Sequence, residues 1–367
     1  MKLRPLVALL GATSLALLGF AASAAASRSD DSAANIARYS AVPAFVAPGP
    51  AFDASKAKGK TIMEIPVANY LPFVVNIGKA MNVIGKQVGV KVISFQNQGQ
   101  PSQWVQGMEQ AISRKVDLIV LNTAPDPRVL GPQLAAARKA GIPVLVTHLY
   151  PAGRKLPANV TAHVPAPFRE AGMLLADGAI AATSGKANVL LISERQFEGS
   201  RVLTAAIRAE LKKSCPTCKL KVVDVPINDW ATKIASSVTT SLTKDPDINV
   251  VLGLYDAMQE QMISGITISG RKGIVTGSYN GVTGVLKRIQ GKQLIAFTVG
   301  ESADQVAYFN MDQALRILTG TPPVKDSKTP FRYFDATNAK DAGVPPKDDT
   351  GYGTDYKSGF LALWEMK

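Results

Sequence analysis

Residues 116–148 constrain the fold most strongly, because they read as a single strand–helix–strand crossover. Val116–Leu121 is a continuous apolar run, as expected for a strand that has helices on both faces of its sheet. Leu130–Ala140 is typical of a helix, and Val144–Thr147 is typical of a second buried strand. A crossover of this kind requires a parallel sheet, whose ligands bind where its strands end. The candidate binding loops are therefore those after the two strands, Asn122–Asp126 and His148–Tyr150.

The same alternation continues on both sides of the crossover and then starts again. Before it, the predicted strands and helices are Thr61–Val67, Val74–Val88, Val90–Phe95 and Pro101–Ser113. After it, they are Ala171–Thr183, Ala187–Ser193, Ser200–Lys213, Leu220–Pro226, Ala231–Thr243, Val250–Leu254, Met258–Ser269, Gly273–Ser278, Gly281–Gln290, Leu294–Val299 and Gln305–Thr319. Two sets of similar size predict an α/β protein with two doubly wound parallel-sheet lobes.

The first 26 residues have the features of a cleaved secretory signal peptide. Lys2 and Arg4 precede the apolar run Leu6–Phe20, and small residues suited to signal peptidase follow it. An uncleaved anchor is the weaker alternative, because the run is short for a membrane span. No cysteine stands directly after the run, which disfavours a lipid anchor. We expect residues 27–58 to form a flexible leader and the mature protein to be periplasmic or otherwise extracytoplasmic.

The charge pattern and the motifs exclude several classes of function. The net charge is +13, or +11 once Lys2 and Arg4 are removed, but the basic residues are scattered along the chain. Neither a basic stripe nor a nucleic-acid-reading motif is present, so nucleic acid is not an expected partner. The sequence also lacks the nucleophile elbow, the zinc-protease motif and the phosphate-binding loop. We therefore predict no catalytic residue, no metal and no cofactor.

The two cysteines, Cys215 and Cys218, lie between a predicted helix and a predicted strand. In an exported protein, an isolated pair of this kind favours a structural disulfide. A redox-active pair is disfavoured, because the motif follows a helix instead of opening one. A closed zinc site needs four ligands, and only His148 and His163 remain to complete one.

Residues 59–335 resemble the ribose-type (type I) periplasmic binding proteins, which are the sugar-binding subunits of ABC importers. The resemblance rests on the order and spacing of short segments, namely Tyr70–Phe73, Ala140–Val144, Glu170–Gly172, Asn228–Trp230, Tyr255–Met258 and Tyr279–Gly281. The tail segments Gly351–Tyr356 and Gly359–Trp364 are also similar to tails in this group. A related repressor carries an N-terminal DNA-binding domain, and here a signal peptide and leader stand in its place.

The resemblance implies two lobes joined by a three-strand hinge, with the ligand in the cleft between them. The chain would cross near Thr161–Phe168, Val299–Ala303 and Thr321–Arg332. The N-terminal lobe would comprise residues 59–163 and 302–325. The C-terminal lobe and tail would comprise residues 164–301 and 326–367.

The resemblance also places ten ligand-binding residues around the cleft: Tyr70, Phe73, His148, Phe168, Arg201, Trp230, Tyr255, Asp256, Asn280 and Glu301. The aromatic residues are suited to packing on a flat apolar ligand face. Phe73, His148 and Trp230 also fit a purely structural role.

Several polar positions depart from the family pattern. His148 stands where sugar binders usually have an aspartate, Phe168 and Tyr255 where they have asparagines, Asn280 where they have an aspartate, and Glu301 where they have a glutamine. An ordinary pyranose would lose hydrogen-bond partners at these positions. The expected ligand is therefore a sugar-like molecule or a flatter aromatic or heterocyclic solute.

The function implied by the resemblance is capture of a small molecule by lobe closure and its delivery to a membrane permease, by a protein that is monomeric and not an enzyme. Two alternatives remain open. One is an extracytoplasmic sensor that presents its ligand to a membrane receptor. The other is a secreted hydrolase that uses His148 and Glu301 in the same cleft.

Overall fold

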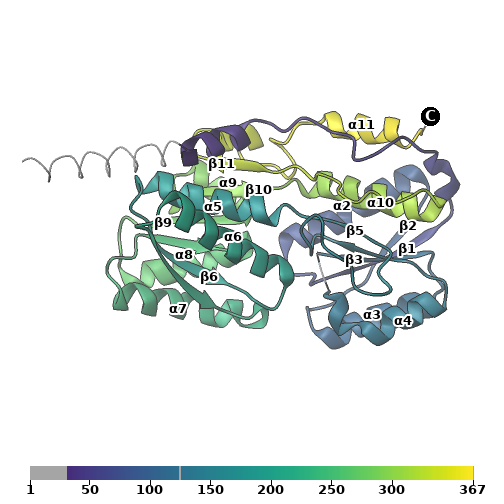
Figure 1. The fold of residues 1–367 in the computed structure, drawn as a ribbon, viewed down its shortest axis with the longest axis horizontal. Coiled ribbons are helices and arrows are strands. Elements are labelled where there is room, and N and C mark those ends of the chain that lie inside the picture. Colours follow the sequence, from purple (N-terminus) through teal and green to yellow (C-terminus); the bar gives the residue numbers. More distant parts are fainter. Residues whose placement is uncertain (1–30, 124, 367) are drawn as a thin grey trace, which may run out of the picture.

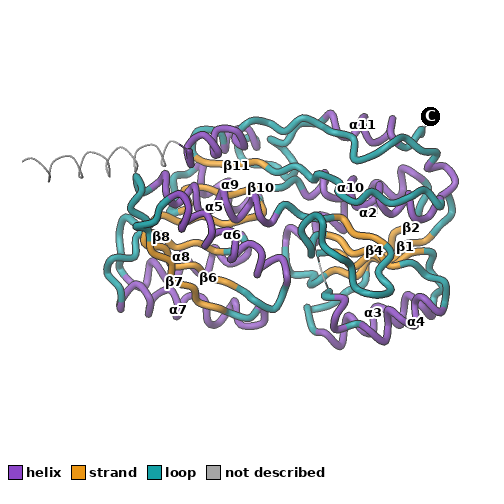
Figure 2. Tube along the Cα trace, in the orientation of Figure 1, coloured by secondary structure: helices purple, strands orange, loops and turns teal. Residues whose placement is uncertain are grey.

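The computed structural model describes residues 31–123 and 125–366, so the predicted signal peptide, residues 1–26, lies outside the described residues. The chain forms two α/β lobes that lie side by side (Figure 1). Strands occupy the centre of each lobe and helices its outside (Figure 2). Among the described helices, none combines the length and the apolar character that crossing a membrane requires.

The first lobe contains a five-stranded parallel sheet with the order β2-β1-β3-β4-β5. Its elements are β1 (Thr61–Pro66), α2 (Pro72–Val88), β2 (Lys91–Ser94), α3 (Pro101–Ser113), β3 (Leu118–Asn122), α4 (Gly131–Lys139), β4 (Val144–Thr147) and β5 (Ala162–Val164). Alternate residues of β3 enter different cores. Leu118 and Val120 pack with the face covered by α2, whereas Ile119 and Leu121 pack with α3 and α4. Helices on both faces explain why the strand is apolar throughout.

The second lobe contains a six-stranded sheet with the order β11-β10-β9-β8-β6-β7. Its elements are α5 (Phe168–Ala182), β6 (Asn188–Ser193), α6 (Glu198–Ser214), β7 (Lys219–Asp224), α7 (Trp230–Lys244), β8 (Val250–Gly253), α8 (Gln259–Ser269), β9 (Val275–Asn280), α9 (Thr283–Gln290), β10 (Ile295–Gly300) and β11 (Arg332–Asp335). Short 3₁₀ helices precede α7 and α8, at Ile227–Asp229 and Asp256–Met258. Only β11, which the sequence analysis did not predict, runs antiparallel to its neighbour.

Three crossings join the lobes at the places that the resemblance implied. Residues 165–167 connect β5 to α5, and residues 301–302 connect β10 to α10 (Ala303–Thr319). Residues 320–331 then return the chain from α10 to β11. The predicted fold, two doubly wound lobes with a three-segment hinge, is confirmed.

The predicted flexible leader is wrong for its described part, residues 31–57, which we call the N-terminal strap. Residues 31–40 are helical, and Tyr39 from this helix stacks on Phe331 at 4.8 Å between ring centroids. The strap then runs to the first lobe, where the Phe52 amide donates to the Leu363 carbonyl at 2.9 Å. Figure 1 shows the strap in purple along the top of both lobes. Its aromatic residues bury apolar surface, which outweighs the disorder that its Ala, Ser and Pro content predicted.

The tail also departs from its expected place in the second lobe. Its helix α11 (Asp355–Leu363) packs on the core of the first lobe, where Phe360 and Trp364 contact Tyr308 of α10. The indole nitrogen of Trp364 donates to Asp312 Oδ1 at 2.9 Å. The assignment of residues 326–367 to the second lobe is therefore wrong for α11, because its apolar face completes the first lobe's core.

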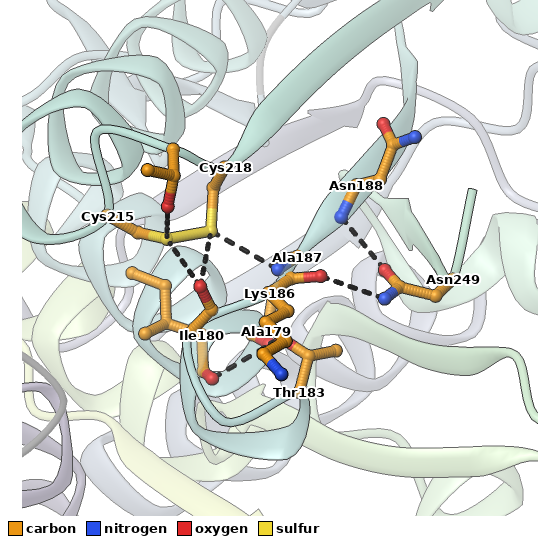
Figure 3. The surroundings of a disulfide bond; sticks show 11 residues. Ala179, Ile180, Thr183, Lys186, Ala187, Asn188, Cys215, Cys218 and Asn249 are labelled. Atoms are coloured by element: carbon orange, nitrogen blue, oxygen red, sulfur yellow. Dashed lines mark hydrogen bonds between the residues drawn. A yellow bond between two sulfur atoms is a disulfide. The ribbon is translucent and has the colours of Figure 1, made fainter. Parts of the chain in front are cut away.

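The predicted disulfide between Cys215 and Cys218 is present, and it joins the end of α6 to the start of β7 (Figure 3). The Ala187 amide donates to Cys218 Sγ at 3.2 Å. Nearby, Asn249 holds two backbone groups beside the same loop, at Lys186 and Asn188. The disulfide thus lies within the fold of the second lobe.

Candidate functional site

A cavity of about 490 Å³ lies between the two lobes. From the first lobe, it is lined by the loop after β1 and by the loop after β4. From the second lobe, it is lined by the starts of α5, α6, α7, α8 and α9, which follow strand ends or a hinge crossing. This is the edge at which parallel α/β sheets bind ligands.

Aromatic side chains form the walls of the cavity. Tyr70 and Phe73 come from the first lobe, and Phe168, Trp230 and Tyr255 come from the second. Tyr70 is 47% exposed, whereas Phe73, Phe168 and Trp230 are buried. Phe197, which the sequence analysis did not single out, also lines the cavity. The site therefore presents flat apolar surfaces from both lobes.

Trp230 is part of the wall and part of the core. Its indole nitrogen donates to the Val225 carbonyl at 3.0 Å, and its ring lies 6.2 Å from that of Tyr255. Only 8% of Trp230 is exposed, and it belongs to the main apolar cluster of the second lobe. Its replacement by alanine would therefore cost stability as well as binding surface.

His148 lines the cavity and contacts residues on the other side of the cleft. Its Nε2 lies 3.1 Å from Glu301 Oε2, and the same carboxylate oxygen accepts a hydrogen bond from the Tyr279 hydroxyl. The Phe73 and Phe168 rings flank the imidazole, each at 5.5 Å between centroids. Burial, followed by the Glu301 charge, holds the pKa of Tyr279 well above its ordinary value, so its hydroxyl stays a donor. Glu301 lies behind the main cavity instead of lining it.

Asp256 lines the cavity, but its carboxylate is already engaged by the protein. It accepts hydrogen bonds from the Ser278 hydroxyl, from the Thr298 hydroxyl at 3.0 Å and from the Val282 amide at 2.8 Å. Burial raises its pKa to about 6. These donors come from β9, β10 and the start of α9, so Asp256 also fixes the strand ends that form the site. Asn280, at the end of β9, lines the cavity beside it.

Gln259 is a cavity residue that the sequence analysis missed. It is the first residue of α8, lines the cavity and is only 1% exposed. Neither its amide nitrogen nor its amide oxygen has a hydrogen-bond partner among the described residues. Its position directly after the segment Tyr255–Met258, three residues after Asp256, was the available signal.

The structure does not bring Arg201 to the cavity. Its guanidinium donates to the Arg195 and Gln196 carbonyls, at 2.7 and 3.1 Å, and it lines a separate surface groove along α6. The residues of this segment that reach the cavity are Phe197 and Gly199, at the start of the helix. The helical phase turns position 201 away from the cleft, which a sequence alignment alone did not fix.

Among the described residues, the ionisable side chains that line the cavity include acidic residues but no lysine or arginine. They include the carboxylates of Asp256 and Glu260, and Glu260 forms an ion pair with Arg288 of α9 at 2.7 Å. Glu301 adds a third carboxyl group behind the wall. Both lining carboxylates are thus engaged by protein groups, so neither presents an uncompensated charge to a ligand.

The fold is shared with solved binding proteins at low sequence identity. The chain is 18% identical to a sugar ABC transporter subunit from Rhodobacter sphaeroides 2.4.1, with a TM-score of 0.68, over 77% of this chain and 99% of that one. An Agrobacterium vitis solute-binding protein with bound alpha-D-tagatopyranose is 20% identical, with a TM-score of 0.70, over 78% and 97% of the chains. An Actinobacillus succinogenes 130z protein with bound D-allose is 18% identical, with a TM-score of 0.69, over 77% and 99%.

Family membership follows from the sequence itself. A search among curated proteins finds no match. A family model described as the periplasmic binding protein domain, however, matches residues 65–322, which include most of both lobes and all of the residues that line the cavity. Together with the two-lobed fold and the cavity between the lobes, this match shows that the chain belongs to the periplasmic binding protein domain family.

Proposed function

We propose that this chain is the extracytoplasmic solute-binding protein of a sugar-type ABC importer. It captures a small molecule between its lobes, closes about the three crossings and presents the closed complex to a membrane permease. It acts as an exported monomer and carries out no chemistry on its ligand.

The observation that carries this proposal is that the cavity walls come from both lobes. Tyr70 and Phe73 face the cavity from one lobe, and Trp230 and Tyr255 face it from the other. A ligand that touches both walls gains contacts only when the lobes are together, so binding favours the closed state. The solved relatives described as ABC transporter subunits and solute-binding proteins support the same assignment.

The arrangement of His148 and Glu301 favours a structural role over hydrolysis. The two side chains contact each other, and Tyr279 donates to the same carboxylate. A general base has to reach the proton that it removes, whereas this carboxylate lies behind the aromatic wall. The pair is therefore better placed to hold the lobes in register than to act on a substrate.

A thermal-shift screen followed by calorimetry tests the proposed function. The mature protein is incubated with sugars, polyols, nucleobases and aromatic acids. A ligand present at 100 times its dissociation constant is expected to add about 2.7 kcal/mol of stability. Calorimetry should then show one site per chain and an unchanged ligand. Identical melting with every class, together with turnover of an ester or a glycoside, contradicts the proposal.

A further inference from the structure

The N-terminal strap is fixed to the second lobe through its helix, residues 31–40. The side-chain amide of Asn35 donates to Asp177 Oδ2 of α5 at 3.1 Å. The carbonyl of Ser40 accepts two hydrogen bonds, from Arg332 Nε of β11 at 2.8 Å and from Asn338 Nδ2 at 3.3 Å. Arg332 is buried, and hydrogen bonds from a charged donor are among the stronger ones. Ser40 is therefore expected to move with the second lobe.

From Phe45 onward, the strap is fixed to the first lobe. The Phe45 amide donates to Asp355 Oδ2 of α11 at 3.2 Å, and the Phe45 ring packs on Phe360 at 5.0 Å between centroids. Arg316 of α10, which is fully buried, donates to the Pro50 carbonyl of the strap at 2.9 Å. Phe45 is therefore expected to move with the first lobe.

Only residues 41–44, which we call the bridge, separate these two attachments. A chain of this length spans at most about 18 Å between the Cα atoms of Ser40 and Phe45. Residues 42–47 contain no helix, strand or turn that could unwind to supply more length, and Pro43 restricts the backbone further. The tail joins the same lobes through the longer segment 343–354. The bridge therefore sets the shorter limit on how far the lobes separate at this point.

The bridge lies at the hinge. Tyr39 and the bridge residues Val42 and Pro43 line a surface cavity of about 470 Å³. The same cavity is lined by residues 165–167 and by Phe331, which belong to two of the three crossings between the lobes. Tyr39 also stacks on Phe331. The strap thus contacts the segments that have to bend when the lobes move, and Figure 1 shows it running along both lobes.

We propose that the strap is a tether that limits the opening of the lobes and thereby sets the affinity of the site for its ligand. The apparent dissociation constant of a protein equals the intrinsic one divided by the fraction of molecules that are competent to bind. A tether that removes widely open conformations raises this fraction without touching the ligand. This inference rests on the proposed function, for which it names a regulating element.

A longer bridge tests the tether, because it leaves both attachments intact. The test variant carries a flexible insert of about eight Gly and Ser residues between Val42 and Pro43. The matched control carries the same insert between Ala140 and Gly141, in an exposed turn of the first lobe that lines neither the ligand cavity nor the hinge cavity. If the test variant does not fold, Val42→Gly combined with Pro43→Gly loosens the bridge without inserting residues.

Two measurements on the mature chain read out the result. Spin labels on Val129→Cys and Ile268→Cys, at exposed residues of the two lobes, report the distance distribution of the unliganded protein. Calorimetry reports the affinity for whichever sugar, polyol, nucleobase or aromatic acid gives the largest shift in the thermal-shift screen. The melting temperature of each variant shows that it is folded.

We expect the distance distribution of the bridge variant to broaden and that of the control to match the wild type. The bridge variant should also bind the chosen solute more weakly, by about threefold or more. An unchanged distribution in the bridge variant overturns the tether, and a broadened distribution with unchanged affinity overturns its link to binding. If no solute binds the folded wild type, the proposed function is contradicted, whereas the label distances of the unliganded protein still decide whether the tether exists.

Discussion

At the scale of single residues, some side chains of the cavity wall are hydrogen-bonded to the protein and others are not. Trp230 and Asp256 are held by hydrogen bonds to their own lobe. Tyr70 is largely exposed at the rim, and the Gln259 amide has no partner in the described chain. Substitutions at the held residues change stability and binding together, whereas Tyr70 reports on binding alone.

Replacing Tyr70 by alanine should weaken ligand binding by about tenfold, which is about 1.4 kcal/mol. The ring supplies one wall of the cavity, and it is exposed enough for the melting temperature to stay nearly unchanged. Tyr70→Phe should retain most of the affinity, because the ring remains. Val129→Ala, at another exposed apolar residue outside the cavity, is the control. Unchanged affinity of Tyr70→Ala, measured by calorimetry, would remove Tyr70 from the site.

Asp177 should make the stability of the protein depend on pH. It is buried, its Oδ2 accepts from Asn35 of the strap at 3.1 Å, and its Oδ1 has no partner among the described residues. Burial raises its pKa from 3.8 to about 6, so the folded state holds this proton more tightly than the unfolded state does. The stabilising effect of the neutral form is complete below about pH 4 and is lost as the pH rises through 6.

Asp177→Asn keeps an oxygen for Asn35 and removes the ionisation. The variant should be more stable than the wild type at pH 7, by up to about 3 kcal/mol, and similar to it at pH 4. Urea unfolding at the two pH values measures the difference. An equal effect at both pH values would mean that ionisation of Asp177 is not the cause.

The single residues that could not be predicted depend on the three-dimensional arrangement of the chain and not on the local sequence pattern. The segment 255–258 was singled out from the sequence. Nothing in the local sequence, however, showed that the amide of the following residue, Gln259, would lack a hydrogen-bond partner. Tyr279 became informative only when the fold brought His148 and Glu301 to it. Arg201 was misplaced because its exposure depends on the helical phase of α6.

At the scale of elements, the predicted strands and helices are those with a strong apolar pattern of their own. The short strand β11 escaped prediction because it is an edge strand whose Arg332 bonds to the Ser40 carbonyl of the strap at 2.8 Å. The helix α11 and the strap depend on each other, since Phe45 packs on Phe360 at 5.0 Å. Such elements are stabilised by tertiary contacts more than by local preference.

The contact between the strap and α11 predicts that the effect of Gly359→Ala on stability depends on whether Phe45 is present. A Cβ added at Gly359 would overlap the ring of Phe45. Gly359→Ala should therefore destabilise the wild type, by about 1–3 kcal/mol. In a Phe45→Ala background the same change should be neutral or stabilising, by up to about 1 kcal/mol, because alanine favours the helix. Unfolding of the four proteins gives the cycle, and additive effects would contradict the contact.

The disulfide should contribute modestly to stability and nothing to binding. It closes a very short loop between α6 and β7, so its entropic effect is expected to be about 2 kcal/mol, well below that of a long loop. Mass spectrometry of the oxidised protein should show no free thiol. The double variant Cys215→Ser, Cys218→Ser should bind its ligand normally, and a large loss of affinity would show that the disulfide supports the site.

At the scale of the whole molecule, the chain links its lobes by more than the three expected crossings. The strap contacts the second lobe through Asn35 and the first lobe through Phe45 and Phe52, and α11 returns the tail to the first lobe. Figure 1 shows both segments along one side of the two lobes. The overall architecture was predictable from repeated strand–helix units, whereas these added links depend on contacts between the two ends of the chain.

The central claim is that ligand binding brings two lobes together. Spin labels on Val129→Cys and Ile268→Cys, which are 53% and 67% exposed on different lobes, report on this motion, and the native cysteines are paired. With a ligand identified by the thermal-shift screen at saturation, we expect the distance distribution between the labels to move and to narrow. An unchanged distribution, with binding verified by calorimetry on the same labelled protein, would contradict closure.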